Sequence, residues 1–434
     1  MKTNKSNPYC DILEASLPRL LSALNTEPAS RVIGSADRLY WAWGAKDFPN
    51  ADFQRGAWPL AVAVELGLLS RDDTAPLVEK MLAFWTRIQH RDGTFDQWFP
   101  EEHSVGTAAF TLADVCATLK LFPEFKPLLR TSALQAARAV SQLGETHGYI
   151  SNHRAGMALA LLRTAEIYGE DGYRDFAHRL LEEILRHQSQ EGWFLEYTGA
   201  DPGYETLALS YLSGCVEIEE IREVREAAER SLEFLAALQH SDGTLGGDYG
   251  ARGTEIVFPA GIEWFWRRGD LSSAGTLASG IRTALTERKL ITPLDCDDSN
   301  FFALLSNYAA AALVTAQNPE SHRKVIPSDS SGGDSSFRHF SDAGLVVIRS
   351  ESGLTTISTR KNGLLRSECG EEVFHDAGYL ASTGGVAAAS CLEDPANETK
   401  IAESTIVIEG GFHVVPLETP TPVHHILLRF LFFT

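Results

Sequence analysis

A turn of the form Gln-x-x-[Asp/Glu]-Gly recurs within the first 245 residues of the chain and limits its fold more than any other feature. It occurs at 89–95, 188–193 and 239–245, each time where a stretch of helical apolar spacing ends. The separations are 188 − 89 = 99 and 239 − 188 = 51, and a degenerate copy at 142–149 divides the larger gap. A period of about 50 residues holds one hairpin of two helices, so the sequence predicts a helical repeat protein.

Helical periodicity runs from residue 10 to about residue 320, with almost no strand-like alternation. That length accommodates about six hairpins, which either close into a ring or stack as an open solenoid. Each repeated turn is followed by a long segment rich in aromatic and acidic residues, and equivalent positions in the repeats lie on one face. We therefore predict an (α/α) toroid at 1–320 with an aromatic and acidic face.

The sequence changes character after residue 320. A polar stretch at 327–336 is typical of a linker. Short β-branched segments bounded by Gly, Asn, Asp and Pro then follow at 343–349, 354–358, 403–409 and 411–415. They predict an antiparallel β domain at 321–434, so the fold class is α+β with more than one domain. We interpret the apolar segment 426–434 as a final strand, and the β domain as incomplete at that point.

Charge and composition exclude several classes of partner. The 38 Lys and Arg residues against 58 Asp and Glu give a net charge of −20, which argues against a nucleic-acid partner. A run of 18 apolar residues is absent from the sequence, so no membrane partner is predicted. The N-terminus lacks an apolar signal core, which predicts a cytoplasmic protein, or a periplasmic one if a leader has been removed. The six cysteines are widely spaced and predict free thiols, and the oligomeric state stays open.

An aromatic and acidic toroid face suits a carbohydrate, because sugar rings stack on aromatic rings while carboxylates and amides bind hydroxyl groups. Trp41 and Trp43 are further stacking candidates, and Asp47 to Asn50 with Arg55 form a candidate rim. The predicted substrate-contacting residues in the toroid are Trp98, Glu101, His103, Arg154, Trp193, Tyr197, Asp201 and Tyr249.

Two segments, 151–154 and 199–207, each run from a loop into a helix one repeat apart, so we expect them to face each other. Asn152 and Tyr204 are 204 − 152 = 52 residues apart. At this point the chain resembles the heparinase II/III-like polysaccharide lyases and the related alginate lyases. The toroid of that family presents an Asn or His in one such loop and a Tyr about fifty residues later.

The resemblance implies an (α/α) toroid joined to an antiparallel β domain, and a lyase that cleaves an acidic, uronic-acid-containing polysaccharide or oligosaccharide. It also implies a catalytic His from the β domain. The matching stretch contains His375 and follows a segment with Arg360, which we assign to substrate binding. This chain lacks the intervening residue of the family's His-x-Asp segment and its second His. The resemblance implies no required cofactor and no catalytic metal, and leaves room for a structural zinc or calcium ion in the β domain.

β-Elimination explains the residue types. Removing the proton α to a carboxylate requires that the carboxylate charge be neutralised while an enolate forms. The resemblance assigns that role to Asn152, with His153 or Arg154 adding positive charge, and makes Tyr204 the base, the acid, or both. An unperturbed Tyr has a pKa of about 10, so its phenolate costs about 4 kcal/mol at pH 7. Arg154 and His375 are the expected partners that offset this cost.

Three other functions fit the same residues. An inverting glycoside hydrolase needs two carboxylates about 6.5–9.5 Å apart. Its candidates here are Asp96, Glu101, Glu196, Asp201, Glu205 and Asp248. A uronate epimerase shares the proton abstraction and differs in reprotonation. A non-catalytic carbohydrate-binding protein of polysaccharide metabolism is the alternative outside enzymes.

Overall fold

The structure is a computed structural model that describes residues 7–37, 49–144, 148–269, 271–318, 336–370, 372–402, 405–415 and 421–432. Within these ranges the toroid contains six helical hairpins, each an outer helix followed by an inner one. The pairs are α1 (Pro8–Ala23) with α2 (Ala57–Glu65), α3 (Arg71–Arg87) with α4 (Val105–Leu121), α5 (Lys126–Gln142) with α6 (Ser151–Tyr168), α7 (Gly172–His187) with α8 (Pro202–Ile218), α9 (Arg222–Leu238) with α10 (Pro259–Gly269), and α11 (Ser272–Thr286) with α12 (Asp298–Gln317). Two short 3₁₀ helices are η2 (Ala51–Gly56) and η3 (Pro123–Phe125).

The inner helices form a closed ring. Contacts run in order from α2 to α4, α6, α8, α10 and α12, and α12 returns to α2. The predicted toroid of about six hairpins is therefore confirmed, and the open solenoid is excluded.

Apolar patterning separates the inner helices from the outer ones. Inner helix α4 is buried around most of its circumference, and most of its buried residues are apolar, with Thr107, Thr111, Asp114 and Thr118 as the polar exceptions. Outer helix α7 buries one stripe, Ala177, Leu181 and Ile184, at helical spacing. An inner helix has neighbours on both sides and an outer layer behind it, so only an almost wholly apolar sequence fits there.

The repeated turn ties neighbouring hairpins together. The Nε2 of Gln89 donates to Gly93 O and to Ser132 O of α5, and the Nε2 of Gln188 donates to Gly192 O and to Ala227 O of α9. Gln239 does the same with Gly243 O and Leu277 O of α11. The motif thus links the end of one outer helix to the next outer helix.

The glycine of this turn is required for two reasons. Gly93 has a φ of +95°, in the left-handed region where a side chain is strained. A Cβ built on it would lie 2.3 Å from Gln135 O of the neighbouring helix, and one on Gly243 would lie 2.1 Å from Gly280 O. Only glycine lets the turn approach that closely.

The ring closes through polar contacts between the first helix and the last hairpins. Tyr9 Oη donates to Glu263 Oε1 at 2.7 Å, and Glu263 also accepts from Arg267 Nε at 3.0 Å and Arg282 Nη2 at 2.6 Å. Arg19 Nη2 pairs with Asp298 Oδ1 at 2.8 Å. We call Tyr9, Glu263, Arg267 and Arg282 the closure network. It joins α1, α10 and α11 across the two ends of the helical region.

The C-terminal part contains ten described strands, all paired antiparallel, which confirms the predicted β class. One sheet has the order β1-β2-β3-β4-β5, a second β10-β7-β6, and β8 pairs with β9. The bounds are β1 Ser336–Phe340, β2 Leu345–Ser350, β3 Gly353–Ser358, β4 Leu364–Cys369, β5 Glu372–Asp376, β6 Leu380–Thr383, β7 Val386–Ala389, β8 Glu398–Ala402, β9 Thr405–Glu409 and β10 His413–Val415.

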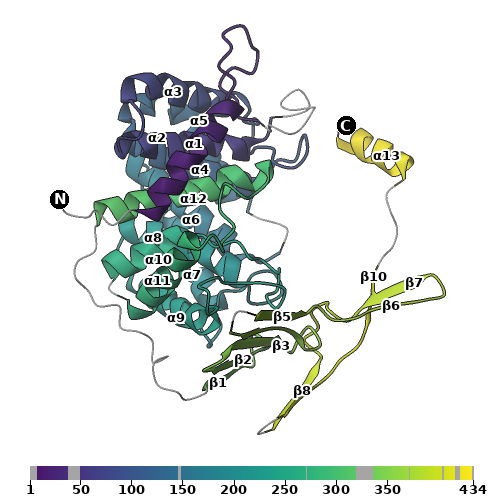
Figure 1. The fold of residues 1–434 in the computed structure, drawn as a ribbon. Helices are drawn as coiled ribbons and strands as arrows, with labels where there is room; N and C mark the ends of the chain where they lie inside the picture. Colours follow the sequence, from purple (N-terminus) through teal and green to yellow (C-terminus); the bar gives the residue numbers. More distant parts are fainter. Residues whose placement is uncertain are drawn as a thin grey trace.

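The final apolar segment was predicted wrongly. Residues 426–434 were interpreted as a strand, but Pro422–Phe432 forms helix α13, which stands apart from the other elements in Figure 1. A short apolar run fits a helix as well as a strand, because periodicity alone does not distinguish the two.

Some sequence predictions lie outside the described residues. These are Trp41, Trp43, Asp47, most of the predicted linker and the domain boundary at residue 320. All six cysteines are free, as predicted. Among the described residues no single helix is long and apolar enough to cross a bilayer, and one pair, α4 with η3 and α5, passes that test only as a chain bent by 119°.

The β domain packs against the repeated turn that follows α9. Arg349 Nη2 donates to Gln239 O at 3.0 Å, and Glu368 Oε2 accepts from Ser241 N at 3.0 Å. Lys361 Nζ donates to Asp248 O at 2.8 Å and Gly250 O at 2.6 Å. The sheet therefore rests beside the α9–α10 connection.

His240 at this junction predicts a pH-dependent stability. Burial, and then the positive charge of Arg366, lower the pKa of His240 to about 3. An unfolded His has a pKa of about 6.5, so below that pH the unfolded chain binds a proton that the folded chain does not, and stability falls as pH drops toward 3. The other groups facing the ring are Asp242, Thr244, Tyr249, Glu368 and His375.

We expect the wild type to lose about 2 kcal/mol of unfolding free energy between pH 6.5 and 5 through His240, and His240→Gln to lose less. Urea unfolding at both pH values measures the difference. An unchanged slope in His240→Gln would contradict the assignment.

Candidate functional site

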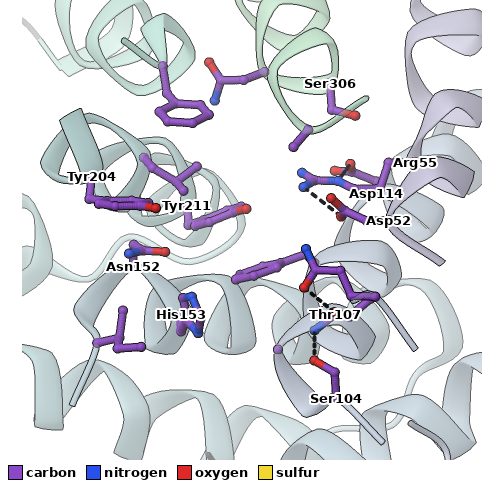
Figure 2. A pocket seen from close by; sticks show the side chains of 18 of the residues that line it. Asp52, Arg55, Ser104, Thr107, Asp114, Asn152, His153, Tyr204, Tyr211 and Ser306 are labelled. Carbon is purple, nitrogen blue, oxygen red and sulfur yellow. Dashed lines mark hydrogen bonds and ion pairs between the residues drawn. The ribbon is translucent and has the colours of Figure 1, made fainter. Parts of the chain in front are cut away.

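A cavity of about 850 Å³ opens at the centre of the toroid. Every described residue that lines it belongs to the helical region, including Asn152 and His153 of α6, Tyr204 of α8 and Asp114 of α4. Figure 2 shows Asn152, His153 and Tyr204 on one side of the cavity and Asp52, Arg55 and Asp114 on the other. The polar lining comes partly from the first turns of the inner helices, and partly from the loops before them and from positions farther along them, such as Arg252 and Asp114 respectively.

The start of the first segment and the residue Tyr149 before it are hydrogen-bonded to the loop that precedes the second segment. Ser151 N donates to Leu195 O at 3.1 Å, and Tyr197 N donates to Tyr149 O at 3.2 Å. These bonds align the start of α6 with the loop that leads into α8. Asn152 and Tyr204 consequently point to the same region of the cavity (Figure 2).

Asn152 is held by a buried carboxylate. Its Nδ2 donates to Glu196 Oε2 at 2.6 Å and its backbone N to Glu196 Oε1 at 2.8 Å, and both residues are almost completely buried. The side-chain nitrogen carries two hydrogens, of which the bond to Glu196 uses one. The amide is therefore fixed in orientation and retains donor capacity toward the cavity.

Tyr204 lies half-buried beside an arginine. Burial raises the pKa of Tyr204 first, Tyr197 adds to the increase, and the positive charge of Arg252 acts in the opposite direction. The Arg252 guanidinium stacks over the Tyr197 ring at 4.3 Å. Arg252 and Tyr197 both line the cavity. This arrangement places a cation near the Tyr204 phenol.

The opposite wall carries a buried ionic cluster. Arg55 Nε donates to Asp114 Oδ2 at 2.7 Å, and its Nη1 lies 3.4 Å from Asp52 Oδ1. Burial raises the pKa of Asp52, as does Asp114, whereas Arg55 lowers it. Tyr211 stacks on Phe110 at 5.6 Å between this cluster and His153, and the His153 ring meets the Phe110 edge at 5.1 Å.

The cavity brings together six of the predicted site residues. They are Trp98, His103, Asn152, His153, Tyr197 and Tyr204. Seven others do not line it: Glu101, Arg154, Trp193, Asp201, Tyr249, Arg360 and His375.

Three of those seven are buried in the packing of the toroid. Asp201 caps α8 by accepting from Tyr204 N at 3.1 Å, and also accepts from Arg252 N at 2.8 Å. Trp193 donates its Nε1 to Glu191, and Tyr249 hydrogen-bonds His240 at 3.0 Å. These aromatic and acidic residues therefore connect loops to one another, and the expectation that they contact substrate is not supported by their positions.

The two arginines predicted to bind substrate, Arg154 and Arg360, also lie outside the cavity lining. Arg154 pairs with Glu183 at 3.1 Å and stacks over Tyr149, and Arg360 lies 3.5 Å from Glu393. Two residues along a helix rotate the side chain by about 200°, so Arg154 points away from the cavity that Asn152 faces. Arg252 takes the place beside Tyr204 that was expected for Arg154.

His375 and Glu101 are outside the cavity lining. His375 lies on β5 opposite Arg366, in the sheet that rests beside the α9–α10 connection. The expected catalytic His from the β domain is therefore not at the cavity. Glu101 is exposed and lies 3.2 Å from His103 Nε2.

The six carboxylates predicted as hydrolase candidates also lie outside the cavity lining. They are Asp96, Glu101, Glu196, Asp201, Glu205 and Asp248. The carboxylates that do line it are Asp52, Glu102 and Asp114. The sequence does contain a signal for Asp114, which is the only carboxylate in the largely apolar stretch 105–119. A carboxylate in such a stretch is rarely buried without a partner, so it marks a position worth considering for the site. Arg252 carries no comparable sequence signal.

Comparison with known proteins identifies the fold. No protein-family model matches the chain, and no curated protein sequence does. The solved structure of chondroitin AC lyase from Streptomyces coelicolor A3 matches with a TM-score of 0.57 at 12% identity, over 90% of this chain and 63% of that one. Xanthan lyase from Paenibacillus matches with a TM-score of 0.55 at 10% identity, over 91% of this chain and 43% of that one.

A family 76 glycoside hydrolase from a bovine Bacteroides thetaiotaomicron strain also matches, with a TM-score of 0.51 at 10% identity, over 72% of this chain and 78% of that one. The chain thus spans less than two thirds of either lyase. Polysaccharide lyases and toroid glycoside hydrolases share its architecture, and at this identity the likeness establishes the fold.

Proposed function

We propose that this protein is a polysaccharide lyase that cleaves a uronic-acid-containing polysaccharide or oligosaccharide by β-elimination. The observation that carries the proposal is the convergence of the Asn152 amide, the Tyr204 phenol and Arg252 on one wall of the toroid cavity. Structural likeness to xanthan and chondroitin AC lyases is consistent with it. The heparinase II/III-like resemblance remains part of the proposal.

Each group has a chemical task in this mechanism. The Asn152 amide and the Arg252 guanidinium bind the uronate carboxylate and stabilise the negative charge that develops on it. The Tyr204 phenolate takes the proton α to the carboxylate, the electron pair forms a carbon–carbon double bond, and the bond to the leaving oxygen breaks. The leaving oxygen then takes a proton, which the Tyr204 hydroxyl returns.

Electrostatics favour an acidic substrate at this position. The whole chain is strongly acidic, so an anionic polymer requires a local positive region. Arg55, Arg163 and Arg252 all line the cavity. Arg55 is paired with Asp52 and Asp114, and Arg163 Nη1 donates to Ala113 O at 2.8 Å. This leaves Arg252, which stacks over Tyr197, as the cavity cation best placed to bind a carboxylate.

A glycoside hydrolase is the second candidate, because Asp52 and Asp114 both line the cavity. The raised pKa of Asp52 suits a general acid. Arg55 binds both carboxylates, however, and a catalytic pair needs room for a water molecule between them. A uronate epimerase and a non-catalytic carbohydrate-binding protein are the remaining alternatives.

Incubation with a panel of uronic-acid polysaccharides tests the proposal. We expect a rise in the ultraviolet absorbance of the conjugated unsaturated uronate that elimination creates. New reducing ends without this absorbance would replace the lyase by the hydrolase and make Asp52→Asn the inactivating variant. Exchange of the α proton with solvent, without cleavage, would indicate the epimerase. Substrate binding with none of these signals would indicate the binding protein.

A further inference from the structure

Arg252, the cation beside Tyr204, lies in an irregular segment between α9 and α10. We call residues 246–254 the Arg252 loop. Four of these nine residues are glycine. Glycine loses more conformational freedom on folding than any other residue, so a loop of this composition is costly to hold in one form. Its form therefore depends on contacts from neighbouring parts of the molecule.

The two ends of the Arg252 loop meet. Gly247 N donates to Thr254 O at 3.3 Å, and a Cβ built on Gly246 would lie only 1.9 Å from the same oxygen. Ala251 N donates to Ala200 O at 2.8 Å. The loop thus closes on itself, and the bond to Ala200 joins it to the segment that leads into α8.

A buried carboxylate joins the Arg252 loop to Tyr204. Asp201 Oδ2 accepts from Arg252 N at 2.8 Å and from Thr254 N at 3.3 Å. Its Oδ1 accepts from Tyr204 N at 3.1 Å, and the whole residue is buried. Hydrogen bonds to a charged acceptor are about twice as strong as those between neutral groups. One carboxylate therefore fixes one side of the loop relative to the first turn of α8.

A lysine from the β domain holds the other side of the Arg252 loop. Lys361 Nζ donates to Asp248 O at 2.8 Å and to Gly250 O at 2.6 Å. These bonds are also charge-assisted, because the donor is an ammonium group. The loop is thus held between a carboxylate that binds its N–H groups and an ammonium that binds its carbonyl groups.

The turn that carries Lys361 is itself fixed. It connects β3 to β4. On one side of Lys361, Thr359 O accepts from Asn397 Nδ2 at 3.2 Å. On the other side, Asn362 Nδ2 donates to Ser390 O at 2.7 Å. The long lysine side chain therefore starts from a fixed backbone, which lowers the entropy lost when its ammonium binds the loop.

We infer that Lys361 is a positioning residue, which orders the Arg252 loop and so keeps the Arg252 guanidinium beside the Tyr204 phenol. The inference rests on the proposed β-elimination, in which Arg252 binds the uronate carboxylate. It gives the β domain a part in the chemistry, although His375 lies outside the cavity lining. Lys361 lies outside that lining too, so it acts on the reaction through Arg252.

A double-mutant cycle tests whether Lys361 acts through Arg252. Lys361→Met keeps an unbranched side chain and removes the ammonium. We expect it to lower kcat/KM for unsaturated product by about 10- to 100-fold, because a displacement of about 1 Å at the reacting groups costs about 100-fold. In an Arg252→Gln background the same substitution should have almost no further effect. A lysine that only stabilises the fold would add its loss to that of Arg252→Gln.

The pH profile of kcat/KM gives a second readout. The charged and titratable groups that act on the Tyr204 phenol are Tyr197, Arg252, Asp201 and Glu196. Arg252 lowers the pKa of Tyr204. Displacing Arg252 through Lys361→Met should therefore move the rise of kcat/KM to higher pH. The shift should not exceed that of Arg252→Gln, and the double variant should match Arg252→Gln.

Hydrogen exchange of the backbone amides at 246–254 needs no substrate, so it tests the inference separately from the proposed function. These amides should exchange faster in Lys361→Met than in the wild type. Lys400 provides the matched control, because it pairs with Glu409 at 3.7 Å on the exposed β8–β9 hairpin. Lys400→Met should keep the wild-type exchange and the wild-type rate. Lys361→Gln removes the same charge if Lys361→Met does not fold.

Failure of the proposed function has a different signature. If the wild type forms no unsaturated product, the lyase proposal fails, and affinity for a uronate oligosaccharide replaces kcat/KM in the same cycle. Unchanged exchange in the Arg252 loop, full activity of Lys361→Met, or additive losses in the double variant would overturn the inference. Uronate binding that does not depend on Arg252 would overturn it as well.

Discussion

Replacing Tyr204 with phenylalanine is expected to lower kcat on the order of 10³-fold while KM for the uronic-acid polysaccharide changes little. The substitution removes only the hydroxyl that moves the proton and keeps the ring that packs at the start of α8. Initial rates of unsaturated product over a range of substrate concentrations separate the two parameters.

Tyr173 provides the control, since its hydroxyl donates to Leu134 O on the outer layer. Tyr173→Phe should retain full activity. Full activity in Tyr204→Phe would remove Tyr204 from the chemistry.

The pH dependence of the reaction tests the role of Arg252. Because Arg252 acts to lower the pKa of Tyr204, Arg252→Gln should move the rise of kcat/KM to higher pH, since a base with a higher pKa loses its proton at higher pH.

Replacing Glu263 with alanine is expected to destabilise the toroid by about 3–5 kcal/mol. Glu263 is fully buried, and its removal leaves the Arg267 and Arg282 guanidiniums and the Tyr9 hydroxyl without their shared acceptor. Arg267 is itself 5% exposed, so water cannot replace the lost charge. The midpoint of thermal or urea unfolding measures the loss.

The neighbouring surface pair provides the comparison. Glu217 bonds Arg268 Nη1 at 2.6 Å, with both side chains partly exposed. Glu217→Ala should cost less than about 1 kcal/mol, because solvent screens an exposed pair. Equal losses in the two variants would contradict the view that the closure network stabilises the ring.

Much of the architecture could be predicted because it depends on short sequence patterns that repeat along the chain. The turns at Gln89, Gln188 and Gln239 identified the repeat, and their spacing gave the number of hairpins. The turn motif alone could not reveal that each Gln side-chain amide donates to the next outer helix. That contact joins residues about 40 positions apart in the sequence, such as Gln89 and Ser132.

The candidate site was harder to predict, for geometric reasons. Asn152 and Tyr204 were found because loop-to-helix boundaries one repeat apart meet in a ring. Arg154 was chosen for its proximity in sequence, although helix rotation directs it to Glu183. The position of His375 depends on how the sheet docks against the toroid, and no local pattern encodes that docking. Arg252 lies in an irregular loop without periodicity.

The closed ring couples assembly of the site to folding of the whole helical region. A linear helical array frays from its ends and keeps its central repeats folded, because those repeats retain both neighbours. Here α12 contacts α2, so the helical region has no terminal repeat. Five different hairpins supply polar residues to the cavity, namely Asp52, Asp114, Asn152, Tyr204 and Ser306. A partly folded ring therefore holds no partial site, and any activity reports a population in which all six hairpins have docked.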